Sequence, residues 1–180
     1  MSKNILMISA SFRKGGNSDL LSDEFIKGAT DTGHKIEKIY LSDTKMEFCR
    51  GCLSCQSTGK CVIEDDISEV LEKMAKVDAV VFTTPIYYYE MAGQMKTFLD
   101  RTNPLFAGEY NFKDIYCILT AADNNEISTQ GPLKGLDGWM YCFDKTKLAG
   151  TLFAGGVTNK GDIKNFPEKL KDAYEMGSKV

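Results

Sequence analysis

The sequence is poor in histidine, in positive charge and in long apolar runs, and each shortage excludes a class of function. His34 is the only histidine among the 180 residues, so a metal site built from imidazoles is excluded. Lys and Arg number 22 against 25 Asp and Glu, and the resulting net charge of −3 argues against a nucleic-acid partner. No stretch reaches the roughly 18–20 apolar residues that cross a bilayer, so we expect no membrane partner.

The cysteines are interpreted from the compartment that the first residues suggest. The apolar run at 5–8 is too short for a secretory signal and leads to no small-residue cleavage site. We therefore expect a cytoplasmic protein whose six cysteines stay reduced. Cys117 and Cys142 lie singly in apolar segments and are interpreted as buried core thiols. The other four lie so close together that they indicate metal ligation or redox chemistry rather than disulfides: Cys49, Cys52, Cys55 and Cys61.

Short apolar runs alternate with segments of helical periodicity along the whole chain. Strands are expected over 5–9, 34–41, 78–83, 114–120 and 147–153. Helices are expected over 18–30, from 66 onward, and over 93–101, 130–142 and 162–176. The acidic residues 64–66 are interpreted as a helix start, because Asp66 and Glu69 have the spacing of a capping box. The alternation predicts an α/β fold, a doubly wound parallel sheet in a single domain over residues 1–180.

The segment after the first strand has the composition of an anion site. It places small hydroxyls, two glycines and two cations directly before a helix, in the order Ser9-Ala10-Ser11-Phe12-Arg13-Lys14-Gly15-Gly16-Asn17-Ser18. Free N–H groups and the positive end of the helix dipole favour phosphate there. A glycine-rich turn with Asn17 or Ser18 as a simple N-cap would have the same composition. The segment matches neither G-x-G-x-x-G nor the P-loop pattern, so neither of those nucleotide sites is supported.

The segment after the third strand carries three consecutive tyrosines, Tyr87, Tyr88 and Tyr89. They cannot all face one core, so at least one ring is expected at the binding edge of the sheet. Offset stacking on a planar cofactor would add about 0.5–1.5 kcal/mol there. A partly buried loop or a dimer surface would also suit them. Residues 120–124 are small and polar and follow the fourth strand, so a mononucleotide with a flat ring fits the strand ends.

Three motifs together resemble the flavodoxin-like NADPH-dependent FMN reductases and, more narrowly, the iron–sulfur flavoproteins among them. They are residues 9–18, residues 85–96 with Asp100 and Arg101, and the cysteine run at 49–61. The resemblance covers most of the first hundred residues, and the later order of strands and helices agrees with it. It implies a flavodoxin-like fold with five parallel strands in the order 2-1-3-4-5 and helices on both faces.

The resemblance also implies an FMN site. The residues that would hold the phosphate lie in the first loop: Ser9, Ser11, Arg13, Gly16, Asn17 and Ser18. The residues that would line the isoalloxazine follow the third and fourth strands: Pro85, Ile86, Tyr87, Tyr88, Thr120 and Ala121. Proteins of this kind are commonly homodimers or homotetramers, so Asp100, Arg101 and residues 104–112 are candidates for a contact between subunits.

Three interpretations of the four-cysteine run stay open. Four thiolates bind one [4Fe-4S] cluster, and the two-residue gaps at Cys49, Cys52 and Cys55 let the chain follow one face of it. Arg50 and Lys60 would offset the negative charge of the thiolates. Zinc is the second interpretation, although cysteines spaced this closely are crowded for a tetrahedral ion. Free thiols on a loop that covers the flavin are the third.

The sequence therefore predicts an FMN-dependent oxidoreductase. It would take hydride from NAD(P)H onto flavin N5 and pass electrons to a quinone, a metal ion, a flavin or a protein. Such chemistry belongs to the cofactor and suits a chain with one histidine. The alternative is an electron carrier that holds cluster and flavin in series, without a productive nicotinamide site. A phosphoacceptor signalling domain is excluded, because Ser9, Thr83 and Thr84 stand where its carboxylates are needed.

Overall fold

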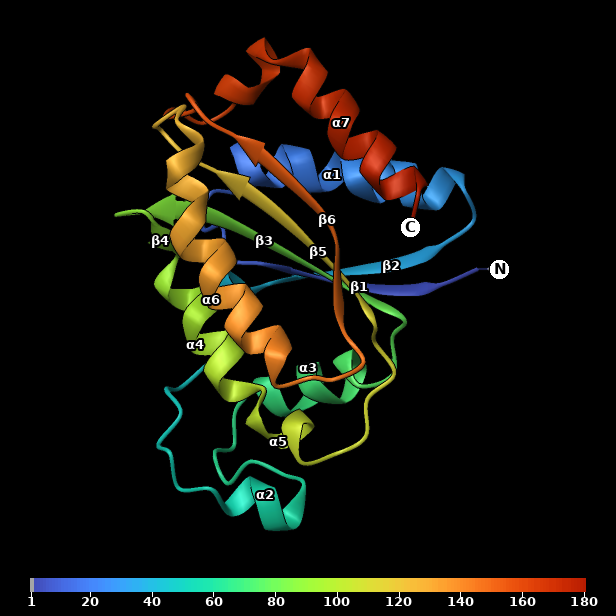
Figure 1. Cartoon of the computed structure of the whole chain (residues 1–180), viewed down its shortest axis with the longest axis vertical. Coiled ribbons are helices and arrows are strands. Elements are labelled where there is room, and N and C mark those ends of the chain that lie inside the picture. Colours follow the sequence, from blue (N-terminus) through green and yellow to red (C-terminus); the bar gives the residue numbers. More distant parts are fainter. Residues whose placement is uncertain (1) are drawn as a thin grey trace.

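A parallel sheet organises the computed structural model, which describes residues 2–180 (Figure 1). Its strands are β1 (Asn4–Ser9), β2 (Lys35–Tyr40), β3 (Ala79–Tyr87), β5 (Asp114–Thr120) and β6 (Lys147–Ala154). They pair in the order β2-β1-β3-β5-β6, all parallel. Numbered along the chain, this is the order 2-1-3-4-5, so the predicted flavodoxin-like topology is confirmed. A short strand that the sequence did not predict, β4 (Glu90–Met91), pairs antiparallel with the end of β3.

Helices cover both faces of the sheet (Figure 1). On one face lie α1 (Asn17–Asp31) and α7 (Pro167–Ser178). On the other lie α3 (Ile67–Met74), α4 (Gly93–Arg101) and α6 (Gln130–Tyr141). Short helical segments complete the described chain: α2 (Ser54–Thr58), α5 (Asn103–Phe106) and the 3-10 turns η1 (Leu41–Asp43), η2 (Glu126–Thr129) and η3 (Asp162–Asn165). Within residues 2–180, no helix has the length and apolar character needed to cross a bilayer.

Alternate side chains of β1 enter two separate cores. Ile5 and Met7 pack into the cluster that includes α1 and α7, while Leu6 and Ile8 pack into the cluster that includes α3, α4 and α6. All four side chains are buried. A strand covered on both faces has no solvent side, which is why this segment is apolar without alternation.

Two glycines bring α1 and α7 into backbone contact. A Cβ added to Gly28 would lie 2.0 Å from the carbonyl oxygen of Tyr174. A Cβ added to Gly177 would lie 2.1 Å from the carbonyl oxygen of Phe25. Neither position has room for a side chain, so the two helices meet at a distance that only glycine permits.

Two predictions near the C-terminal half are wrong. Residues 162–176 do not form one helix, because η3 ends at Asn165 and α7 begins at Pro167. Proline suits the first turn of a helix but disfavours helical geometry in the residue before it. Cys117 is buried as predicted, whereas Cys142 is exposed. Its neighbour Phe143 fills the core position instead, which leaves the thiol outside.

The start of α3 is confirmed, but its predicted capping box is wrong. Asp66 is the N-cap residue, yet its side chain makes no cap hydrogen bond. The carboxylate instead accepts the N–H of Lys45 at 2.7 Å. The helix N–H of Ile67 donates to Asp65 at 3.2 Å. The acidic residues therefore connect the helix start to the chain segment that precedes the cysteines.

Candidate functional site

The loop between β1 and α1 is shaped by its two glycines. Gly15 has a φ of +69°, in the left-handed region that favours glycine. A Cβ on Gly16 would lie 2.6 Å from the carbonyl oxygen of Arg13, which accepts the N–H of Gly16 at 2.8 Å. The N-cap of α1 is Gly16 rather than Asn17 or Ser18, and no side chain caps this end. The helix N-terminus is thus suited to an anion.

Hydroxyl groups connect this loop to the neighbouring strands. The hydroxyls of Ser18 and Thr120 lie 2.7 Å apart and are buried, which joins the start of α1 to the end of β5. Ser11 Oγ accepts the N–H of Arg13 at 3.3 Å. Ser9 is fully buried, and its Oγ has no hydrogen-bond partner among residues 2–180. The polar groups that the sequence singled out therefore gather at the carboxyl ends of β1 and β5.

The three tyrosines form the hairpin between β3 and β4. Tyr87 pairs with Glu90, and the two residues between them, Tyr88 and Tyr89, have φ values of +51° and +60°. Tight hairpin turns require positive φ at these positions, but they usually place asparagine or glycine there. The Tyr89 hydroxyl donates to Asp123 at 3.0 Å, and this bond raises the pKa of Tyr89. The hairpin is therefore a strained turn that presents a fully exposed ring, Tyr88.

A cavity of about 180 Å³ opens where these segments meet. Nine of the twelve predicted flavin-site residues line it: Ser11, Arg13, Asn17, Ser18, Pro85, Ile86, Tyr87, Thr120 and Ala121. Ser9, Gly16 and Tyr88 are not among its lining residues. Ser9 lies behind the surface, Gly16 has no side chain to contribute, and the turn geometry directs Tyr88 into solvent.

Sequence reasoning missed the third wall of this cavity, which Val157 and Thr158 form. Ala122, which also lines it, belongs to the predicted segment 120–124. The segment after β6 reaches the first loop through two hydrogen bonds. Arg13 donates to the carbonyl oxygen of Thr158 at 3.0 Å, and Asn17 donates to that of Asn159 at 2.9 Å. The glycine pair 155–156, one residue beyond the predicted strand 147–153, is a signal that could have drawn attention to this segment.

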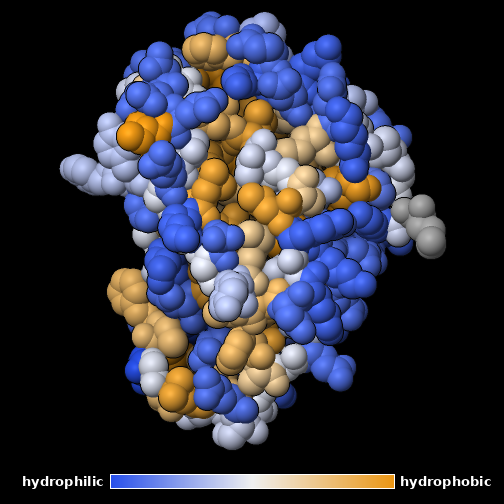
Figure 2. All heavy atoms as spheres, viewed as in Figure 1, coloured by the Kyte–Doolittle hydropathy of each residue, from blue (hydrophilic) through white to orange (hydrophobic). Residues whose placement is uncertain are grey.

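A larger hollow of about 690 Å³ lies between α6, α7 and β6, and Figure 2 shows apolar surface along it. None of the predicted site residues lines this hollow. Its rim carries charged side chains of α7 of both signs, including Lys169, Asp172 and Glu175. The smaller cavity, where hydroxyls, a guanidinium and a helix N-terminus converge, is the better candidate for chemistry.

The four clustered cysteines share a second, much smaller pocket of about 20 Å³. Cys49 and Cys52 are exposed, Cys61 is half-buried and Cys55 is buried. Among residues 2–180, however, no group of three His, Cys, Asp or Glu side chains is arranged to hold a metal ion. Figure 2 shows apolar surface near the end of the molecule that carries α2. Four large apolar side chains in or next to the cysteine segment and in α5 are exposed: Phe48, Leu53, Val62 and Phe106.

One amide and one guanidinium group donate hydrogen bonds to cysteine sulfur atoms in this pocket. Asn103 Nδ2 donates to Cys55 Sγ at 3.2 Å, and Arg101 Nη2 donates to Cys61 Sγ at 3.7 Å. Burial raises the pKa of the Cys55 thiol. A hydrogen bond from Ser54 lowers the pKa of Cys52, which makes Cys52 the more acidic of the two thiols. The pocket thus holds two unlike environments for sulfur.

Arg101 is buried inside the chain, where it forms an ion pair with Asp65 at 2.6 Å. This corrects its expected place at a contact between subunits. Within residues 104–112, Tyr110 and Phe112 are also buried in the core, so exposed positions such as Asp100 and Phe106 remain for such a contact. The error has a simple reason, because a charged residue is usually exposed unless a partner is buried with it.

Comparison with known proteins decides the family. Residues 3–130 match the family model described as NADPH-dependent FMN reductase. The chain belongs to this family. The match includes the whole first loop, the tyrosine hairpin and the cysteine run described above. The resemblance predicted from the motifs is therefore confirmed.

Relatives of this chain include proteins named iron–sulfur flavoproteins. One from Archaeoglobus fulgidus is 38% identical over 97 residues, which is 54% of this chain and 44% of that protein. One from Methanocaldococcus jannaschii is 36% identical over 104 residues, 58% of this chain and 54% of that protein. The chain therefore spans about half the length of these curated relatives.

A solved structure extends the likeness to the whole fold. The NAD(P)H:quinone oxidoreductase from Methanothermobacter marburgensis superposes with a TM-score of 0.73 and 17% identity. The superposition covers 99% of this chain and 96% of that one. At this level of identity, the comparison supports the architecture of the chain and adds nothing about a substrate.

The donor set of the first cavity fits FMN. Hydroxyls, a guanidinium and a helix N-terminus suit a phosphate, whereas Pro85, Ile86 and Tyr87 offer an apolar wall. Sites that enclose ligands of this size measure roughly 300–1,000 Å³. The present cavity is smaller, so it would take the phosphate end and leave the flavin ring at its mouth.

Proposed function

We propose that this chain is an FMN-dependent NAD(P)H oxidoreductase with its flavin at the cavity between the first loop and the tyrosine hairpin. The observation that carries the proposal is the convergence of nine predicted site residues, from three separate chain segments, on one cavity. Family membership supports FMN and a nicotinamide donor. The electron acceptor would be a quinone, a metal ion, a flavin or a protein.

The residues divide into two roles. Ser11, Arg13 and Ser18, with Asn17 and the N–H groups of α1, would hold the phosphate. Pro85, Ile86 and Tyr87 would lie against one part of the flavin, with Thr120 and Ala121 opposite. When bound, FMN supplies the redox chemistry, because its ring accepts hydride from the nicotinamide and releases electrons to the acceptor. The protein's task is to orient the ring and to exclude water from its buried side.

A subunit contact would complete the site. Tyr88 is fully exposed on a strained turn beside the mouth of the cavity, and a large ring in that position is stabilised when another surface covers it. We propose a homodimer or homotetramer in which a neighbouring subunit covers this hairpin. Sedimentation of wild type and Tyr88→Ser would test it, because the variant should shift toward smaller species.

Flavin titration tests the proposed function directly. Purified protein should bind FMN, and the bound flavin should bleach when NADH or NADPH is added without oxygen. Arg13→Ala should weaken FMN binding, on the order of tenfold, because it removes a charged donor to the phosphate. Lys134→Ala is the control, since this exposed lysine of α6 lies outside the cavity. Wild type that neither binds FMN nor bleaches would overturn the proposal.

A second candidate function is an electron carrier with a [4Fe-4S] cluster on the cysteine segment. Two observations favour this function. The four thiols share one pocket, and the side chains of Asn103 and Arg101 donate N–H groups to Cys55 Sγ and Cys61 Sγ. Cys49, Cys52, Cys55 and Cys61 would be the ligands. When present, the cluster would supply one-electron transfer, and the hydrogen bonds to sulfur would raise its reduction potential.

Metal analysis after anaerobic purification separates the three interpretations of the cysteines. About four irons and four labile sulfides per chain would indicate the cluster. They should vanish in the Cys52→Ala/Cys55→Ala variant and persist in Cys142→Ala, a control with an exposed thiol outside the segment. Zinc alone would indicate the second interpretation. Metal-free protein with full reductase activity would indicate free thiols and remove the carrier function.

A further inference from the structure

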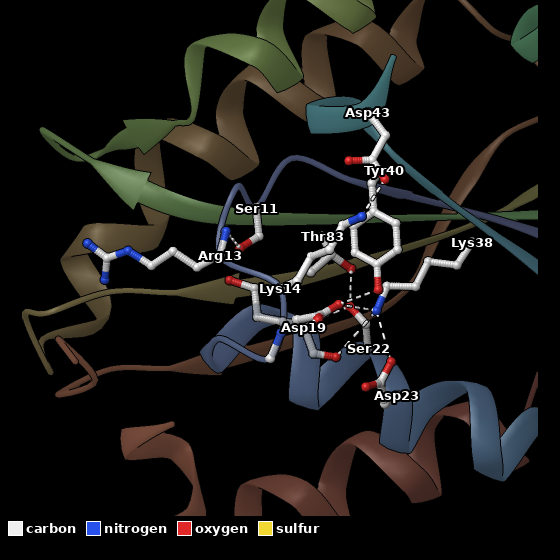
Figure 3. A network of polar contacts seen from close by, with 12 residues as sticks. Ser11, Arg13, Lys14, Asp19, Ser22, Asp23, Lys38, Tyr40, Asp43 and Thr83 are labelled. Atoms are coloured by element: carbon white, nitrogen blue, oxygen red, sulfur yellow. Dashed lines mark hydrogen bonds and ion pairs between the residues drawn. The ribbon is translucent and has the colours of Figure 1, made fainter. Parts of the chain in front are cut away.

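A buried network of charged groups lies directly beneath the first loop (Figure 3). Asp19 projects from the first turn of α1, and Lys38 and Tyr40 reach it from β2. Lys38 forms an ion pair with Asp19 and a second one, at 2.9 Å, with Asp23. The Tyr40 hydroxyl donates to Asp19 at 2.8 Å. The motif search singled out none of these side chains as part of the site.

Both members of the central pair are charged and almost inaccessible. The side chain of Asp19 is 5% exposed and that of Lys38 is 8% exposed. Burial raises the pKa of Asp19, but bonds from Lys38, Gly15 and Tyr40 outweigh it and leave this pKa below its ordinary value. Burial lowers the pKa of Lys38, but Asp19 and Asp23 outweigh it and leave that pKa raised. Removing Lys38 would leave the negative charge of Asp19 buried without this cation, which is energetically costly.

Asp19 is also joined to the loop that would hold the phosphate. Its second carboxylate oxygen accepts the N–H of Gly15 at 2.6 Å, which stabilises the left-handed turn at that glycine. Asp19 follows Asn17 and Ser18, which both line the cavity. A negative charge so close to a phosphate dianion would repel it unless a cation neutralises the charge. Lys38 is the cation that directly contacts Asp19.

We propose that Lys38 is a positioning residue that neutralises Asp19 and thereby sets the preference of this site for a phosphorylated flavin over an unphosphorylated one. Lys38 lies outside the lining of the cavity and acts through Asp19. The proposal rests on the proposed function, because it assumes that the flavin phosphate occupies the first loop. It adds that the discrimination between FMN and an unphosphorylated flavin depends on the balance of charge between Asp19 and Lys38 beneath that loop.

The test compares two ligands, FMN and riboflavin, which differ only in the phosphate. In Lys38→Met the carboxylate of Asp19 loses its cation, so FMN affinity should fall on the order of tenfold. Riboflavin affinity should change less than about threefold. Asp19→Asn keeps an oxygen that can accept the Gly15 N–H but removes one of the two carboxylates that contact Lys38. The charge beneath the loop becomes more positive, so the ratio of FMN to riboflavin affinity should rise. The Asp19→Asn/Lys38→Met double variant should return the ratio to near the wild-type value.

Lys27→Met is the matched control, since it removes one positive charge from an exposed position on α1. It should leave the ratio unchanged. Two outcomes would overturn the proposal and leave Lys38 a purely structural role. Lys38→Met could weaken the binding of FMN and of riboflavin equally, or the double variant could fail to restore the ratio of the two affinities. If Lys38→Met fails to fold, Asp19→Asn tests the proposal instead. An unchanged ratio of FMN to riboflavin affinity in Asp19→Asn would also overturn it. Wild type that binds no FMN would instead overturn the proposed function.

Discussion

Two buried ion pairs support the two loops that carry the candidate chemistry, and they do so in different ways. Asp19 and Lys38 lie beneath the loop between β1 and α1, whereas Asp65 and Arg101 lie beneath the cysteine segment. Each aspartate accepts backbone N–H groups of the loop that it supports. For Asp19 the donor is Gly15, and for Asp65 the donors include Glu47 at 2.9 Å.

The difference lies in the cation. Arg101 donates to both oxygens of Asp65, at 2.6 and 2.9 Å, and also to the carbonyl oxygen of Glu47 at 2.7 Å. This planar, two-point contact fixes geometry and connects both ends of the cysteine segment. Lys38 is a point charge whose partners on α1 are Asp19 and Asp23. The Asp65–Arg101 pair holds the shape of the cysteine segment. In our proposal, the Asp19–Lys38 pair sets the charge beside the candidate flavin cavity.

The largest effect should come from removing the shape-holding cation. Arg101→Leu leaves Asp65 buried without its partner, which should lower the free energy of unfolding by about 3–5 kcal/mol. Urea denaturation followed by circular dichroism measures it. The control Lys134→Leu breaks an exposed pair with Asp137 and should change little. A loss for Arg101→Leu no greater than for this control would show that the Asp65–Arg101 pair does not hold the cysteine segment in place.

The pH dependence of stability should show the charge of Asp65. Burial raises the pKa of Asp65, but bonds from Arg101 and from the Glu47 N–H outweigh it and leave this pKa below its ordinary 3.8. The stabilisation is therefore complete above the ordinary pKa and is lost as the pH falls through the lowered one. Asp65→Asn should cost about 1–3 kcal/mol at pH 7. Denaturation series from pH 7 to pH 2 should show this difference shrinking below about pH 4; a difference constant with pH would contradict the assignment.

The cysteine segment should react unevenly in metal-free protein. Cys52 is exposed and its pKa is lowered, whereas Cys55 is buried and its pKa is raised. Alkylation by iodoacetamide should therefore modify Cys52 about tenfold faster than Cys55, because the thiolate is the reactive form. Cys117, whose pKa burial raises to about 12, should stay unmodified until the protein unfolds. Peptide mass spectrometry over time resolves the three sites, and equal rates would show that the pocket does not shield Cys55.

The smallest effect on stability should come from a residue proposed for binding. Arg13 is exposed, and its guanidinium contacts the carbonyl oxygen of Thr158. Arg13→Ala should change the free energy of unfolding of the flavin-free protein by no more than about 0.5 kcal/mol. Thermal unfolding with and without FMN measures both consequences, because the ligand should stabilise wild type more than the variant. A large loss without FMN would make Arg13 part of the framework.

The architecture was predictable because its signals are local. Residues such as Ile5 to Ile8 are apolar without interruption, and a strand covered on both faces requires this. The first loop was singled out for a similar reason, since glycines, hydroxyls and cations gather directly before a helix, although a simple glycine-rich turn shares this composition. Nine of the twelve predicted flavin-site residues accordingly line one cavity.

The rest depends on contacts between residues far apart in the sequence. Asp65 and Arg101 are 36 positions apart, and no local pattern marks them as partners. Lys38 occupies an exposed-looking place in an alternating strand, yet the first turn of α1 covers it. The turn at Tyr88 and Tyr89 was unpredictable for another reason, because tyrosine rarely adopts positive φ and no turn signal is written there.

The close backbone contact of α1 with α7 at Gly28 and Gly177 has a consequence for biosynthesis. The helix that follows the first loop, α1, finishes packing only when α7 is present. A ribosome-bound chain that still lacks α7 leaves one side of α1 uncovered, with the loop ahead of it unsupported. Flavin uptake should thus follow the synthesis of α7, and nascent chains arrested before Pro167 should emerge without flavin.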